Sequence, residues 1–158
     1  MKITIISVGK IKEKYLNDAI NEYEKRISKF AEVDNIVLPD EPISDNASKA
    51  IENQIIDTES KRIIKAIPKN SFVVVLDILG KQLDSVDFSK KIDDFFSRSS
   101  NIVFIIGGSL GLSDELKNMA NYRLSFSKMT FPHMLMKVIL LEQVYRSFKI
   151  LNNEKYHK

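Results

Sequence analysis

The stretch from Asn101 to His133 constrains the fold of this chain more than any other part of it. It opens with a short, β-prone apolar run, Ile102–Ile106, that ends abruptly at Gly107-Gly108. A short apolar run closed by glycine is typical of a buried parallel strand whose C-terminal end leads into a loop. Ligands of open α/β sheets collect at those carboxyl ends. The sequence therefore predicts a glycine-rich loop beside a ligand site.

A second loop follows in the same stretch. Ser113 is suited to cap a short helix, with Asp114 and Glu115 in its first turn, where the helix dipole favours acids. Tyr122–Phe126 indicates another strand, and Ser127–Pro132 a loop before a long helix. Because both loops follow strands of the same sheet, we expect them to close on one ligand.

The rest of the chain alternates strands and helices. Further strands are expected at Lys2–Val8, Val33–Leu38 and Ser71–Ile78, the last closed by Gly80, and helices within 11–30, 51–67, 86–97 and about 131–151. This alternation predicts an α/β fold with a mostly parallel sheet flanked by helices. The length of 158 residues fits a single domain, 1–158, and we find no repeat, linker or low-complexity tract.

Composition narrows the possible functions. The chain has no cysteine and only two histidines, far apart, so we expect neither disulfides nor a metal site. No apolar run approaches the roughly 18 residues that a membrane span needs. The first residues lack the apolar region and cleavage site of a signal peptide. We therefore expect a cytoplasmic protein without membrane segments.

Charge is unevenly distributed along the chain. Residues 32–59 contain eight acids and one base, a local charge of −7, whereas residues 123–158 contain seven bases and two acids, a local charge of +5. Such asymmetry favours a polyanionic partner for the C-terminal part. Two solvated surfaces of opposite charge would explain it equally well.

The final helix carries two apolar stripes where one would suffice to cover a sheet. One consists of Met134, Val138, Leu141, Tyr145 and Phe148, and the other of Met136, Leu140, Val144 and Leu151. Either the helix lies across a subunit interface, or it runs through the centre of a monomer core.

The two loops differ from known phosphate-binding motifs. GGSLG lacks the lysine of a P-loop, and its spacing differs from the dinucleotide fingerprint. The glycines would instead allow close approach of the backbone to a ligand. The second loop could wrap an adenine, with Met129 and Phe131 as apolar walls and Leu76 as a third. Either loop could also be purely structural.

Four further residues carry suitable chemistry. His133 could act as a base or contact the substrate, or simply begin a helix. Tyr156 and His157, next to the last lysine, are groups that stack on bases and hold phosphates, although a chain end ordinarily frays. Arg146 could hold a phosphate or stabilise an anionic base, or pair with Glu142 one helical turn away.

Six segments occur in an order that is similar to one known family. They are SVGK near the start, LDILGK at 76–81, IGGSLGL, LSFSKMTFPH, EQVYRSFKI and the terminal YHK. The series covers essentially the whole chain and resembles the ribosomal RNA large subunit methyltransferase H family of the SPOUT class. Leu110 departs from the pattern, being apolar where a small or polar residue is expected.

This resemblance implies an S-adenosylmethionine-dependent enzyme that methylates N3 of a pseudouridine in 23S rRNA of the ribosome. It also implies a trefoil-knotted α/β fold and a homodimer. Residues implied to bind the methyl donor are Leu76, Gly107, Gly108, Ser127, Lys128, Met129, Thr130, Phe131 and Pro132. Those implied to act on the RNA are His133, Arg146, Tyr156 and His157. Two rival functions are a non-catalytic ribosome-binding module and an enzyme acting on free nucleotides.

Overall fold

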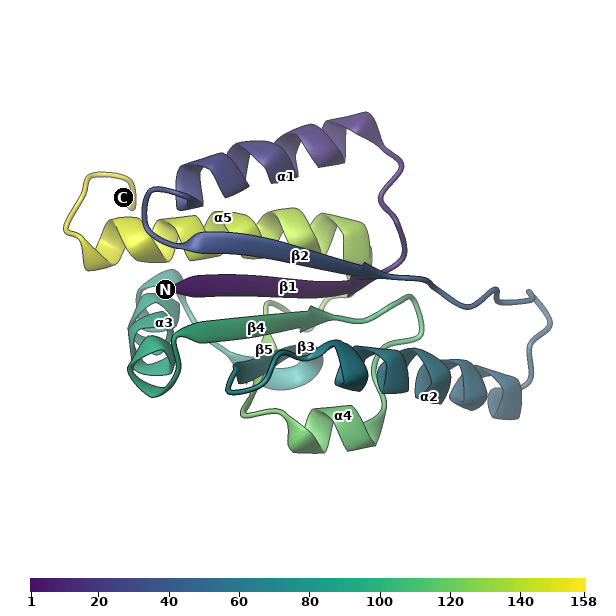
Figure 1. Ribbon diagram of the computed structural model, residues 1–158. Coiled ribbons are helices and arrows are strands. Elements are labelled where there is room, and N and C mark those ends of the chain that lie inside the picture. Colours follow the sequence, from purple (N-terminus) through teal and green to yellow (C-terminus); the bar gives the residue numbers. More distant parts are fainter.

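The computed structural model describes residues 1–158 and contains five strands and five helices in strict alternation (Figure 1). The strands are β1 (Lys2–Val8), β2 (Glu32–Leu38), β3 (Phe72–Gln82), β4 (Asn101–Ile106) and β5 (Tyr122–Ser125). The helices are α1 (Lys14–Ile27), α2 (Lys49–Ala66), α3 (Ser85–Arg98), α4 (Asp114–Met119) and α5 (His133–Leu151). The alternation predicted from the sequence is confirmed.

The strands form one sheet in the order β2-β1-β4-β3-β5, and every neighbouring pair is parallel. The sheet is thus wholly parallel, where the sequence predicted a mostly parallel one. All carboxyl ends consequently meet at one edge, and the loops that follow β3, β4 and β5 start there. β4 and β5 are consecutive along the chain, yet β3 lies between them.

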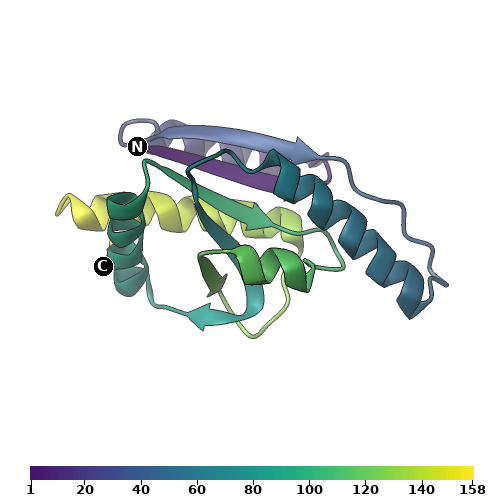
Figure 2. The ribbon, with the colours of Figure 1, turned by 60° about the horizontal axis from the view of Figure 1, so that its bottom comes forward.

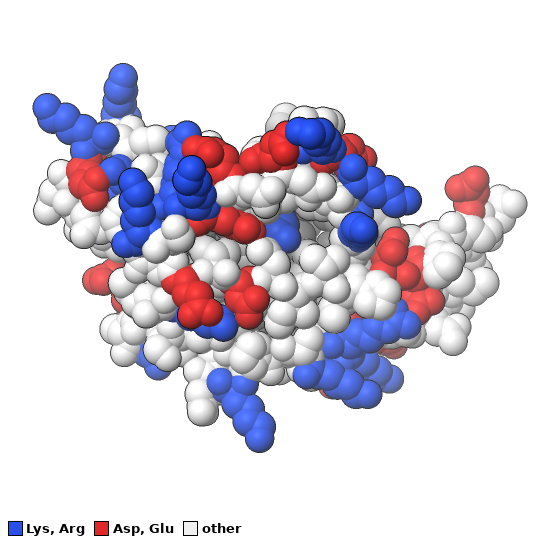
Figure 3. All heavy atoms as spheres, turned by 45° about the horizontal axis from the view of Figure 1, so that its top comes forward, with Lys and Arg blue, Asp and Glu red and all other residues white.

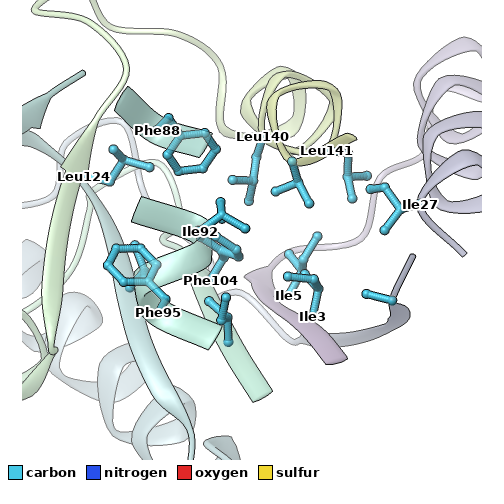
Figure 4. Close-up of a cluster of buried hydrophobic side chains, with 14 of the residues drawn as sticks. Ile3, Ile5, Ile27, Phe88, Ile92, Phe95, Phe104, Leu124, Leu140 and Leu141 are labelled. Atoms are coloured by element: carbon cyan, nitrogen blue, oxygen red, sulfur yellow. The ribbon is translucent and has the colours of Figure 1, made fainter. Parts of the chain in front are cut away.

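Both faces of the sheet are covered by helices (Figures 1 and 2). The alternating residues of β1 show the division, since Ile3 and Ile5 belong to the core under α1, α3 and α5. Ile6 and Val8 belong to a smaller core on the opposite face, under α2 and α4. Figure 4 shows the larger core, with Leu140 of α5 pointing toward the sheet. Burial on both faces explains why the strands read as continuous apolar runs.

Helix α5 runs through the centre of the larger core. It packs against α1 and α3, and both Leu140 and Val144 are fully buried within a single chain. The monomer fold therefore explains the doubled apolar stripe, and the stripe does not require a partner subunit.

Strand β3 is longer than predicted. Gly80 does not close it, because the strand continues to Gln82 with a register shift between Leu76 and Lys81 where it pairs with β5. A Cβ on Gly80 would lie 2.8 Å from the Arg123 backbone, so close packing against β5 requires glycine there. The glycine thus marks an irregularity inside the strand rather than its end.

None of the helices combines the length and the hydropathy that crossing a membrane would demand.

Candidate functional site

A cavity of about 750 Å³ lies at the carboxyl edge of the sheet. Both predicted loops line it, the first through residues 107–112 and the second through Ser127 and residues 129–132. Leu76 and Ile106, at the ends of β3 and β4, line the cavity as well. Both loops thus line one cavity, and its volume lies within the roughly 300–1,000 Å³ of small-molecule sites.

The glycine-rich loop is a tight turn. Gly111 donates its N–H to the Gly108 carbonyl over 3.1 Å, and the two residues form an isolated bridge. Gly111 has a φ of +89°, a conformation that glycine adopts without strain. After the turn, the Ser113 hydroxyl accepts from the N–H of Leu116 and caps α4, as predicted.

The second loop is held in shape by its own serines. The Ser125 hydroxyl donates to the Ser127 carbonyl over 3.0 Å, and the Ser127 hydroxyl accepts from the N–H of Met129 over 2.9 Å. Met129 remains 73% exposed at the cavity mouth. Lys128 is exposed and does not line the cavity, unlike its neighbours on either side.

One ion pair lies in the cavity wall. Lys117 Nζ is 3.6 Å from Asp77 Oδ1, which also accepts from the N–H of Leu79. Asp77 is buried and Lys117 largely so. They are the only Asp, Glu, Lys or Arg residues lining the cavity, so the charges of its walls cancel and much of the rest is apolar. Neither residue was predicted from the sequence, although an acid directly after the apolar run Phe72–Leu76 was a usable signal.

His133 begins α5 and lines the same cavity. Its ring lies beside the ends of β1 and β2, since a Cβ on Gly9 would be 3.8 Å from His133 Nε2 and 3.8 Å from Asp40 Cγ. An imidazole therefore faces the space that the two loops enclose, on the side of the cavity where Gly9 follows β1.

The other three residues expected to act on RNA gather at the far end of α5. The Arg146 guanidinium donates to the Glu142 carboxylate over 2.6 Å and lies over the Tyr156 ring, with Cζ 4.7 Å from the ring centroid. His157 Nδ1 is 3.3 Å from Arg146 Nη1, and the Tyr156 hydroxyl donates to Glu142 over 3.2 Å. The pair of Arg146 with Glu142, which the sequence left as an alternative, is formed. The tail is thus packed on its own helix rather than frayed.

Within one chain the expected RNA-facing residues form two separate groups. His133 and Arg146 are thirteen residues apart on α5, which corresponds to roughly 20 Å along the axis. Figure 3 shows Lys and Arg side chains gathered at the end where α1 and α5 terminate, where Lys25 and Arg26 lie in the last turn of α1 and Lys149 in that of α5. The basic cluster at the C-terminal ends of α1 and α5 is therefore spatially distinct from the cavity of the same chain.

Comparison with known proteins assigns the fold to a family. The family model described as "Predicted SPOUT methyltransferase" matches residues 1–157. The chain belongs to the SPOUT methyltransferase family. Over the full length of both chains, it is 56% identical to "Ribosomal RNA large subunit methyltransferase H" of Clostridium botulinum (strain 657 / Type Ba4). It is 50% identical, also over both full lengths, to the protein of that name from Acetivibrio thermocellus.

A solved structure, described as that of "a probable methylase family protein from Haemophilus influenzae Rd KW20", shares the fold. It matches with a TM-score of 0.53 at 14% identity, covering 99% of this chain and 70% of that one. The structure described here holds no group of three or more His, Cys, Asp or Glu residues placed to bind a metal ion.

Proposed function

We propose that this SPOUT methyltransferase transfers a methyl group from S-adenosylmethionine to 23S rRNA of the large ribosomal subunit, at N3 of a pseudouridine. The observation that carries the proposal is the two-loop cavity in a chain at least 50% identical, over its whole length, to proteins named as ribosomal RNA large subunit methyltransferase H. We also infer the trefoil knot that this family implies, and action in the cytoplasm, where ribosomes assemble.

The cavity fits the methyl donor in size and chemistry. Its apolar walls, among them Leu76, Met129 and Phe131, suit an adenine ring, and the glycine turn at Gly107-Gly108 lets backbone groups approach a polar ligand closely. The donor and acceptor groups of the two loops would then fix its orientation. When bound, S-adenosylmethionine supplies a methyl group already activated by its sulfonium, so the protein contributes mainly positioning.

Methylation at N3 requires the loss of the N3 proton. His133 is the residue we propose as proton acceptor, because it lines the cavity and an imidazole nitrogen can accept a proton as a general base. His157 is the second candidate. Arg146 has five fixed N–H donors suited to a phosphate or to the anionic form of the base, and engaging either would require it to leave Glu142.

A homodimer would bring the two groups of residues together. Three apolar residues that line the cavity are at least one-third exposed, namely Ile78, Met129 and Phe131, and so are Leu79 and Leu135, each of which is next in sequence to a lining residue. Exposed apolar clusters of this kind mark interaction surfaces. We propose that a second copy covers this rim and brings its own Arg146, Tyr156 and His157 to the cavity, so that each site uses both chains.

Transfer of an isotopically labelled methyl group to purified ribosomes tests the proposal. Ribosomes from a strain that lacks the modification should become labelled, and mass mapping should locate the label on N3 of a pseudouridine in 23S rRNA. Free nucleosides serve as the control substrate. Labelling of nucleosides in preference to ribosomes would support the free-nucleotide enzyme, and the absence of any labelling would support the non-catalytic module.

A further inference from the structure

Helix α2 carries two polar residues at buried positions. Glu59 is 4% exposed and Ser60 is 1% exposed, although glutamate is among the residues least often buried. Both face the loop that follows β4, Glu59 at Gly108 and Ser60 at Ser113. A buried carboxylate needs partners, and the hydrogen-bond partner of Glu59 is the N–H of Glu41, in the segment that follows β2.

The two carboxylate oxygens of Glu59 contact two different loops. Oε2 accepts from the N–H of Glu41, in the segment that follows β2, over 2.9 Å. Oε1 lies 2.9 Å from the place where a Cβ on Gly108 would be, and the next nearest side chain, that of Val8, is 3.5 Å from it. A side chain at position 108 would therefore require the Glu59 carboxylate to move away.

The contact with Glu59 provides a reason for glycine at position 108 besides the close approach of a ligand. The φ of Gly108 is not positive, so backbone conformation does not demand glycine. A Cβ would point toward Glu59 on α2. Gly108 lets the backbone lie against the carboxylate, while the same residue lines the cavity.

Ser60 holds the other end of the same loop. Its hydroxyl accepts from the N–H of Ser113 over 2.9 Å, and Ser113 in turn caps α4. Two adjacent residues of α2 thus contact the loop at Gly108 and at Ser113, on either side of the turn. One turn further, Arg62 contacts the Pro39 carbonyl and pairs with Glu41, which fixes the segment that donates to Glu59.

We infer that Glu59 is a positioning residue for the methyl donor. It holds the Gly108 backbone in the position from which that backbone contacts the ligand. The inference rests on the proposed function, because it assumes that S-adenosylmethionine occupies the cavity. Glu59 itself does not line the cavity and touches no reacting atom. Its loss should consequently weaken donor binding far more than it slows methyl transfer at saturating donor.

The experiment is a donor titration of the full-length protein carrying single and paired substitutions. Glu59→Ala removes the carboxylate and should weaken S-adenosylmethionine binding roughly tenfold or more, whereas Glu59→Gln keeps the shape and should bind within about threefold of the wild type. Gly108→Ala should also lose roughly tenfold in affinity, because its methyl group displaces Glu59. Asp57→Ala is the matched control, an exposed acid on the same helix.

Size complementation gives the most specific readout. Combining Gly108→Ala with Glu59→Ala should bind the donor more tightly than Gly108→Ala alone, since the added methyl group enters the space the carboxylate left. If Glu59→Ala fails to fold, Glu59→Asp provides the same test, because it withdraws the carboxylate by one methylene. In each variant that binds, kcat should fall by less than the donor KM rises.

Two results would overturn the inference while leaving the proposed function intact. One is a Glu59→Ala protein that binds the donor as tightly as the wild type. The other is a double variant that binds no better than Gly108→Ala alone. A wild-type protein that binds no S-adenosylmethionine would instead overturn the proposed function and this inference together.

Discussion

At the scale of single residues, Lys137 is the least expected side chain in the core. It lies on α5 one turn after His133, is only 5% exposed, and makes no hydrogen bond or ion pair within the chain. Burial lowers the pKa of its amine, and the carboxylate of Glu24 opposes that change. The amine is not fully enclosed, since the Tyr122 hydroxyl is the only buried side-chain polar atom without a hydrogen-bond partner, so the partial loss of hydration of the amine opposes folding modestly.

Replacing this amine should stabilise the isolated chain. Lys137→Met keeps the length of the side chain, and we expect the free energy of unfolding to rise by about 1 kcal/mol. Because the pKa is lower in the folded protein, the unfolded state binds more protons between that value and the ordinary 10.5, so wild-type stability should rise with pH in this window. Thermal unfolding across alkaline pH should show the rise in the wild type and not in Lys137→Met. A less stable Met variant would indicate that the amine is paired in the assembled protein.

Glu59 should show the opposite dependence in acid. Burial raises its pKa, the neighbouring Asp40 and Glu41 raise it further, and the Glu41 N–H and Arg62 lower it. Because the folded state binds the carboxyl proton more tightly than the unfolded state, this proton adds to the stability of the fold. The contribution is complete below pH 4.5, the ordinary pKa, and is lost as the pH rises through the folded-state pKa. The stability of the wild type relative to Glu59→Gln should therefore fall across that window, as measured by denaturant unfolding at a series of pH values. A difference that does not change with pH would contradict the assignment.

At the scale of elements, apolar pattern and glycine placement predicted most of the fold. Lys2–Val8 was placed correctly because its apolar residues end at Gly9, and Ser113 because capping chemistry is local. Gly80 was wrongly predicted to end its strand, because glycine is required there by the nearby backbone of Arg123, which is distant in sequence. Pattern likewise could not place Asp77 against Lys117, or Glu59 against Gly108, since both contacts depend on how α4 and α2 pack.

The C-terminal tail, residues 156–158, packs on α5 of its own chain, whereas its proposed role is at the cavity of the partner chain. Deleting residues 156–158 removes the contacts of Tyr156 with Tyr145, Arg146 and Glu142, so we expect a loss of roughly 1–2 kcal/mol in stability, with donor binding unchanged. Methyl transfer to ribosomes should collapse, because the aromatic and imidazole groups suited to RNA are gone. Lys155→Ala, an exposed change in the same segment, is the matched control. Full transfer by the truncated protein would return the tail to a structural role on α5.

At the scale of the whole molecule, the proposed dimer depends on the apolar rim of the cavity and not on the buried stripes of α5. Charges introduced at Leu140 or Val144 would disrupt the monomer core, so they cannot report on association. Leu79→Glu and Leu135→Glu change exposed positions and should yield folded monomers in sedimentation at micromolar concentration. Ile51→Glu, an exposed apolar position on α2, should remain dimeric. A wild-type protein that sediments as a monomer would refute the proposed assembly.

The central claim is that the two loops at the carboxyl edge of the sheet form the S-adenosylmethionine site. Thr130 lines the cavity and Lys128, two residues earlier in the same loop, does not, so Trp substitutions at the two positions differ mainly in where the added bulk lies. Calorimetric titration should show donor binding by the wild type and by Lys128→Trp, and no binding by an equally stable Thr130→Trp. Wild-type affinity in a folded Thr130→Trp protein would contradict the claim.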